Sequence, residues 1–343
     1  MTKLRTTLGP LLTLLAACSS SPTTSVGADV PAVTRTDAAT DADAASADAR
    51  SDDVAAAIDV PAADVPVADA PGADVSPAVA ALVAARPFHL AVPDGYDASH
   101  PAPLLVLLHG YGASGLLQDL YFHMTREANM RGVLYATPDG TMDASGMRFW
   151  NASDACCDFA HTGVDDVAYI DAIIADVSAR YAVDPRRIYL LGHSNGAFMS
   201  HRMACDRAGE IAAIVALAGA TFFDATRCAP SEPVSILDVH GTADAVIAYD
   251  GGVNVGVRYP GETTTMARWA GYDRCAATTS LDPSIDLDTG LAGAETLVAH
   301  HDGCTGVAVD LWTIVGGTHL PALGASWAPA VLDWLLAHPK PAH

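Results

Sequence analysis

Short apolar runs alternate with segments of helical periodicity along most of this chain, and that alternation restricts the fold more than any other feature. The runs PLLVLLHG (103–110), RIYLLGHS (187–194) and VSILDVHG (234–241) end at turns, as strands buried on both faces of a sheet do. Segments such as 116–130 and 164–181 carry apolar residues at helical spacing. This order predicts an α/β fold with a mostly parallel central sheet and helices on both faces.

Two segments of different composition precede the region 81–343, which we assign to that α/β domain. Residues 1–18 have a basic start and a short apolar run, and they end at Cys18 after small residues. This pattern is typical of a lipoprotein-type signal peptide with Cys18 lipidated, although an ordinary secretory signal has a similar pattern. Residues 19–80 are rich in Ala, Asp and Pro, with eleven Asp, no Glu and no aromatic residue. We expect them to form a disordered acidic tether.

The net charge of the chain argues against a nucleic-acid partner. The chain has 40 acidic and 18 basic residues, a formal net charge of −22. Binding to a phosphate backbone needs a basic face, so we expect no nucleic-acid partner. The same charge argues against electrostatic docking on anionic lipid, which leaves a lipid anchor at Cys18 as the only membrane contact that we expect.

Six cysteines follow Cys18, an even number that suggests three disulfides in an exported domain. The spacing favours Cys275–Cys304, because both residues lie in one late region of the chain. Cys156 and Cys157 could bridge each other, but adjacent cysteines more often bond outward to two partners. No C-x-x-C motif is present, and we expect neither a metal nor a cofactor. The disulfide candidates are Cys156, Cys157, Cys205, Cys228, Cys275 and Cys304.

One serine stands at a corner between a predicted strand and a predicted helix. Residues 192–196, Gly-His-Ser-Asn-Gly, match G-x-S-x-G in the context of a nucleophile elbow. At so tight a turn, a side chain at either glycine would collide with neighbouring backbone. The geometry would place the Ser194 hydroxyl in a cleft at the carboxyl end of the sheet.

A serine hydroxyl needs a general base and an acid that orients the base. In this arrangement the chain order is serine, then acid, then histidine. Asp244 follows one predicted strand and His319 follows the last one, so Ser194, Asp244 and His319 are the predicted catalytic residues. Asp250 is a rival for the acid, whereas Asp238 would point the wrong way from a regular strand.

The oxyanion of an acyl-transfer intermediate needs two N–H donors. We expect them to be the backbone N–H groups of Asn195, at the start of the helix, and Tyr111, in the loop after 103–110. His109, His193 and His240 also stand next to glycines at strand ends. We interpret them as structural residues that hydrogen-bond or pack at these turns.

Several motifs in a fixed order resemble one family. From about Arg86 to His338 the chain is similar to the extracellular poly(3-hydroxybutyrate) depolymerase and feruloyl esterase group of α/β-hydrolases. The motifs are VP-x-GYD (92–97), FWN (149–151), ACCDF (155–159), GVDDVAYI (163–170), YAVDPRRIYLLGHSNGAFMSHRMAC (181–205), VHGTADAVIAYDGG (239–252) and GGTHLPAL (316–323).

The resemblance implies an α/β-hydrolase fold with Ser194, Asp244 and His319 as its triad, and it favours Asp244 over Asp250. The family commonly has a tryptophan just after the catalytic histidine, where this chain has Leu320. That tryptophan is thought to line the substrate crevice, so its absence argues against polyester binding and does not affect the triad.

Together these features predict an exported serine esterase that works through an acyl-serine intermediate. The substrate would be a polyester oligomer, as for a polyhydroxybutyrate depolymerase, or a feruloyl or acetyl ester of a plant polysaccharide. We expect the protein to be lipid-anchored at the bacterial cell envelope or secreted. Two alternatives remain: a serine peptidase of the same fold, and a non-catalytic surface-binding protein on a hydrolase scaffold.

Overall fold

The computed structural model describes residues 75–342. The predicted signal peptide with Cys18, and the predicted tether up to residue 74, lie outside the described residues. Within the described range, no helix has the length and apolar character needed to cross a membrane.

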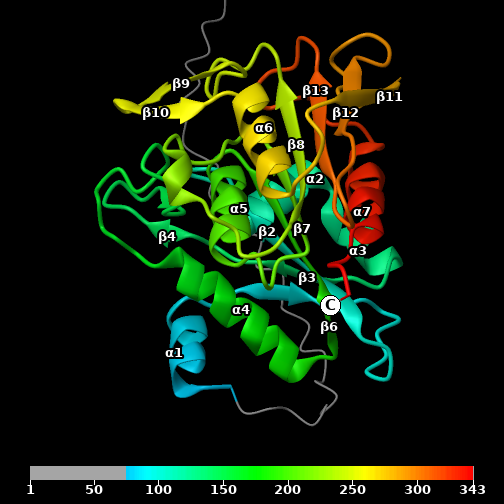
Figure 1. Ribbon diagram of the computed structural model, residues 1–343. Coiled ribbons are helices and arrows are strands. Elements are labelled where there is room, and N and C mark those ends of the chain that lie inside the picture. Colours follow the sequence, from blue (N-terminus) through cyan, green and yellow to red (C-terminus); the bar gives the residue numbers. More distant parts are fainter. Residues whose placement is uncertain (1–74, 343) are drawn as a thin grey trace, which may run out of the picture. The chain divides into compact units, whose positions relative to one another are not determined.

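A nine-stranded sheet forms the centre of the domain (Figure 1). Its five central pairings, from β3 through β2, β6, β7 and β8 to β13, are parallel, whereas β1, β12 and β11 are antiparallel at the edges. The predicted mostly parallel sheet is therefore confirmed. In spatial order the strands are β1 (His89–Ala91), β3 (Leu134–Thr137), β2 (Ala102–Leu108), β6 (Val183–His193), β7 (Ala213–Leu217), β8 (Ser235–Gly241), β13 (Val309–Ile314), β12 (Thr296–His301) and β11 (Thr279–Ile285).

Helices cover both faces of this sheet, as predicted (Figure 1). Strand β2 shows why: Leu104 and Val106 belong to one apolar cluster, and Leu105 and Leu107 to another on the opposite face. Helices α4 (Asp166–Arg180), α5 (Asn195–Asp206) and α6 (Glu262–Tyr272) pack in the first cluster. The second cluster contains α2 (Gly115–Phe122), α3 (Met124–Met130) and α7 (Trp327–Ala337).

Two predicted boundaries are wrong. The segment 116–130 is not one helix, because His123 adopts a left-handed conformation with φ 54° and separates α2 from α3. Helix α1 (Pro77–Ala85) includes residues 77–80, which we assigned to the tether. Ser76 caps this helix by accepting a hydrogen bond from Val79 N, and Pro77 suits its first turn.

Short elements follow the carboxyl ends of several strands of the sheet. Two hairpins are formed by β4 (Thr141–Met142) with β5 (Arg148–Phe149), and by β9 (Gly251–Asn254) with β10 (Val257–Pro260). A short 3₁₀ turn, η1, spans Ala225–Arg227.

Three disulfides join the six cysteines: Cys205–Cys228, Cys275–Cys304 and Cys156–Cys157. The second is the pairing that the spacing favoured. The expectation that the adjacent pair bonds outward is wrong. Because the other four cysteines pair among themselves, no outward cysteine partner remains for Cys156 or Cys157 within residues 75–342.

Candidate active site

Ser194 sits in a strained turn between β6 and α5, with φ 53° and ψ −119°. The two flanking glycines are required by close packing. A Cβ on Gly192 would lie 2.2 Å from the carbonyl oxygen of Gly196, and one on Gly196 would lie 1.9 Å from that of Leu108. The turn is held by a 2.8 Å hydrogen bond from Ser194 N to the carbonyl oxygen of Leu217 in β7. Close packing therefore requires glycine at both positions, as predicted from the sequence.

Three predicted residues form a continuous chain of hydrogen bonds. The Ser194 hydroxyl lies 3.0 Å from His319 Nε2, and His319 Nδ1 lies 2.7 Å from Asp244 Oδ2. The other oxygen of Asp244, Oδ1, accepts hydrogen bonds from Val246 N at 2.8 Å and Ile247 N at 2.9 Å. With the carboxylate on Nδ1–H, the lone pair of Nε2 faces the hydroxyl, which is the tautomer that can accept its proton.

The loops that carry Asp244 and His319 are bonded to each other through their backbones. Ala243 N donates to the carbonyl oxygen of Gly317 at 2.9 Å, and Gly316 N donates to Thr242 Oγ1 at 2.8 Å. A Cβ on Gly241 would lie 2.2 Å from the oxygen of Gly317, so only glycine permits this approach. The acid and the base are therefore fixed relative to each other by their main chains.

Asp244 remains ionised although it is buried. Burial disfavours the charged carboxylate, but hydrogen bonds from His240 and His319 outweigh that effect, so the pKa of Asp244 lies well below its ordinary value. The rival acid Asp250 is exposed and lines a different depression, beside Arg268. Asp238 is buried and faces His201 Nε2 at 3.2 Å.

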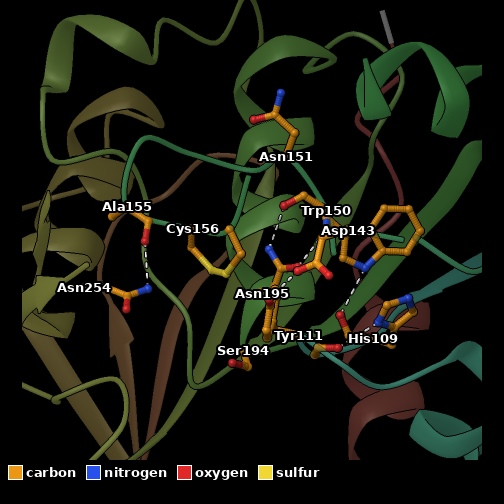
Figure 2. Close-up of a disulfide and its surroundings, with 12 residues drawn as sticks. His109, Tyr111, Asp143, Trp150, Asn151, Ala155, Cys156, Ser194, Asn195 and Asn254 are labelled. Atoms are coloured by element: carbon orange, nitrogen blue, oxygen red, sulfur yellow. Dashed lines mark hydrogen bonds between the residues drawn. A yellow bond between two sulfur atoms is a disulfide. The ribbon is translucent and has the colours of Figure 1, made fainter. Parts of the chain in front are cut away.

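The two residues predicted to supply oxyanion donors flank the serine. Asn195 is the first residue of α5, so its backbone N–H has no acceptor within the helix. The buried side chain of Asn195 makes two hydrogen bonds to the main chain of Trp150: Oδ1 accepts from Trp150 N at 2.7 Å, and Nδ2 donates to Trp150 O at 2.9 Å (Figure 2). Tyr111 follows Gly110, where an added Cβ would lie 3.5 Å from the Ser194 Cβ. Their role as donors stays a prediction.

The loop with the Cys156–Cys157 disulfide lies beside Trp150 and Asn195 (Figure 2). Cys157 N donates to Trp150 O at 3.2 Å, and Asn254 Nδ2 in β9 donates to Ala155 O at 2.8 Å. The disulfide loop is thus tied to Asn195 through Trp150 and to the β9–β10 hairpin through Asn254.

Two of the three strand-end histidines have the structural role expected of them. His109 donates from Nδ1 to the carbonyl oxygen of Gly110 at 2.8 Å and accepts from Gly140 N at 2.9 Å. His193 Nε2 lies 3.0 Å from the carbonyl oxygen of His319 and so supports the backbone of that loop. Burial lowers the pKa of His109 and that of His193 to about 4, which keeps both rings neutral.

His240 differs from that expectation. It does bond a backbone carbonyl, that of Ile247, at 2.8 Å, but it also contacts two carboxylates, Asp244 and Glu262. Sequence reasoning missed Glu262. Its only signal is its place as the first residue of α6, which does not indicate that its side chain turns toward β8.

The chain is similar in sequence to known esterases. The profile of the phospholipase/carboxylesterase family matches residues 96–259. The chain is 29% identical to feruloyl esterase B of Piromyces equi, over 66% of this chain and 41% of that protein. It is 31% identical to a probable feruloyl esterase C of Aspergillus niger, over 52% of this chain and 62% of that protein. The chain thus spans less than two thirds of the length of either relative.

Among solved structures, acetyl xylan esterase from Aspergillus awamori superposes with a TM-score of 0.51 at 14% identity, over 72% of this chain and 93% of that one. A thermostable esterase superposes with a TM-score of 0.50 at 16% identity, over 74% of this chain and 60% of that one. At these identities the likeness concerns the fold.

Proposed function

We propose that this chain, a member of the feruloyl esterase-like group of α/β-hydrolases, is a serine esterase that uses Ser194, Asp244 and His319. The observation that carries the proposal is the hydrogen-bond chain from the Ser194 hydroxyl through the His319 ring to the Asp244 carboxylate. The strained turn at the serine, the order of the three residues and the named relatives support it.

The reaction would proceed in two steps. His319 Nε2 takes the proton of Ser194 as Oγ attacks the ester carbonyl, and then gives that proton to the departing alcohol, leaving an acyl-serine. In the second step, His319 takes a proton from water as the water oxygen attacks the acyl carbon. The bond from that carbon to Oγ of Ser194 then breaks, His319 returns the proton to Oγ, and the acyl group leaves as a carboxylic acid. Asp244 holds Nδ1–H throughout and stabilises the charged ring. The backbone N–H groups of Tyr111 and Asn195 would bind the oxyanion.

For the substrate we propose a feruloyl or acetyl ester of plant polysaccharide, because the relatives are named feruloyl esterases. The polyester reading has less support, since Leu320, 60% exposed, stands where a crevice tryptophan would be expected. We also propose that the protein is exported. The three disulfides agree with an oxidising compartment. The lipid anchor at Cys18 remains part of this proposal.

The test compares kcat/KM on methyl ferulate with that on a soluble 3-hydroxybutyrate trimer, with Ser194→Ala as the blank. Preference for the ferulate supports the proposed substrate, and preference for the trimer replaces it with a polyester. Labelling by a fluorophosphonate probe that is lost in Ser194→Ala would exclude a non-catalytic binding protein. Rates that persist in Ser194→Ala would refute the mechanism.

A further inference from the structure

Behind the triad lies a second buried imidazole–carboxylate pair that the proposed mechanism does not use. His240 Nε2 is 3.2 Å from Asp244 Oδ2, the same oxygen that accepts from His319. On the other side of the ring, His240 Nδ1 is 2.5 Å from Glu262 Oε1 in α6. The relative exposures are 1% for His240 and 2% for Glu262. The groups therefore continue the line Ser194–His319–Asp244 into the protein interior.

The contacts of His240 favour a charged ring when both neighbouring carboxylates are ionised. Nε2 faces Asp244 and the carbonyl oxygen of Ile247, and Nδ1 faces Glu262, so both ring nitrogens meet acceptors. A neutral imidazole carries only one N–H and could satisfy one side only. A charged ring donates on both sides, and a charge buried this deeply is stable only when it is paired.

The electrostatics agree with that geometry. Burial disfavours the charged ring, but the charge of Glu262 and the hydrogen bonds to Asp244 and Glu262 outweigh it and raise the pKa of His240 to about 10. Burial and the nearby Asp238 raise the pKa of Glu262. Tyr249 faces the His240 ring with its centroid 5.7 Å away, and burial raises its phenol pKa too. The titratable groups in contact with His240 are Asp244, Tyr249 and Glu262. One step further out, Asp238 acts on Glu262, His319 bonds Asp244, and the charge of His240 lowers the pKa of His193.

We propose that His240, paired with Glu262, is a positioning residue for ester hydrolysis that keeps Asp244 ionised and aimed at His319. This inference rests on the proposed function. The ring supplies Oδ2 of Asp244 with a second charge-assisted donor, opposite His319. Without it, one of the two side-chain donors to that oxygen is lost, and the carboxylate loses the charged partner that faces it from β8.

A purely structural pair would stabilise the fold and leave the pH dependence of turnover unchanged, so the pH profile separates the two roles. His240→Leu should lower kcat about a hundredfold, and His240→Gln, which restores an N–H donor without charge, should lower it about tenfold. KM should change less than about twofold, because the buried ring has no access to substrate.

Glu262→Gln tests the charge alone, since the amide retains an oxygen that can accept from Nδ1. Without the carboxylate, the pKa of His240 should fall to or below the ordinary value of about 6.5. The charged ring exists only below its pKa. The ratio of this variant's kcat to the wild-type kcat should therefore decline as pH rises from about 6.5 to 8.

Asp273→Asn is the matched control. Asp273 is another buried carboxylate at the end of α6, accepts a hydrogen bond from Val234 N at 3.2 Å and has no contact with Asp244 or His240. Burial raises its pKa to about 7. Its variant should keep the wild-type pH profile of kcat. A wild-type profile in Glu262→Gln, or an unchanged kcat in His240→Leu, would overturn the proposal.

The protonation of His240 can also be measured without turnover, by ¹⁵N NMR of the imidazole nitrogens at pH 8. Two protonated nitrogens in the wild-type protein and one in Glu262→Gln would support the inference, whichever ester the chain hydrolyses. A neutral His240 in the wild-type protein would overturn it. Absence of esterase activity in the wild-type protein would overturn the proposed function and, with it, the positioning role assigned to His240.

Discussion

Replacing Asp244 by asparagine should inactivate the protein while keeping its shape, and the hydrogen bonds around the carboxylate show why. Oδ1 accepts from two backbone N–H groups, those of Val246 and Ile247. An asparagine must place its carbonyl oxygen there, because its NH₂ group cannot accept. The NH₂ group then takes the position of Oδ2, opposite the N–H groups of His240 and His319.

Donor would therefore face donor, and His319 would adopt the other tautomer, with its proton on Nε2. In that form Nε2 cannot accept the proton of Ser194. A triad forced into the wrong tautomer loses about 10⁴-fold in kcat, roughly 5 kcal/mol of transition-state stabilisation. The assay is kcat on methyl ferulate at pH 8, corrected by the Ser194→Ala blank.

The matched control is Asp250→Asn, which changes the exposed rival acid in the same segment and should leave kcat unchanged. Near-ultraviolet circular dichroism of both variants should match that of the wild-type protein. A loss of less than tenfold in Asp244→Asn, or a comparable loss in Asp250→Asn, would refute the assignment of the acid.

Three further outcomes are expected. Asp273→Asn should raise the melting temperature at pH 8 but not at pH 4. The pKa of Asp273 in the folded protein, about 7, exceeds the ordinary value of 3.8, so the folded state loses stability as pH rises between these two values. Equal shifts of the melting temperature at both pH values would contradict this. Replacing Cys205 and Cys228 by serine opens a loop of sequence separation 23 and should cost about 3 kcal/mol in urea unfolding; an unchanged midpoint would argue against the bond. Leu320→Trp should raise kcat/KM on the 3-hydroxybutyrate trimer relative to methyl ferulate, and an unchanged ratio would show that this position does not contact substrate.

The central strands could be predicted because strands buried on both faces consist of continuous apolar residues, a pattern visible in the sequence. In β2 every residue is buried, so the run is apolar without alternation. The break at His123 could not be predicted in this way. Histidine adopts the left-handed conformation more often than most residues but still only rarely, and the segment around it keeps helical periodicity on both sides. The cause is tertiary: α2 and α3 must each turn an apolar face to the same cluster, where Phe122 and Met124 are both fully buried.

Local constraints made the serine predictable, whereas the acid depended on tertiary contacts. Gly192 and Gly196 mark the turn because backbone atoms approach within contact distance at both. Asp244 and Asp250 stand only six residues apart, and spacing alone leaves both open. The structure separates them through the backbone bonds that join residues 242–243 to 314–317, which bring Asp244 and not Asp250 against His319.

Loop packing, hydrogen bonding and charge pairing all constrain one segment of five residues, His240-Gly241-Thr242-Ala243-Asp244. Gly241 is required by the close approach of the His319 loop, and Thr242 and Ala243 bond that loop. His240 is the next-to-last residue of β8, and its Nε2 lies 3.2 Å from Asp244 Oδ2. Nothing local requires a histidine there, because a backbone contact alone could be made by many residues. The requirement comes from Glu262, 22 positions later, whose buried charge needs a cationic partner. A charged histidine at this position is therefore explained by the acid on each side of it.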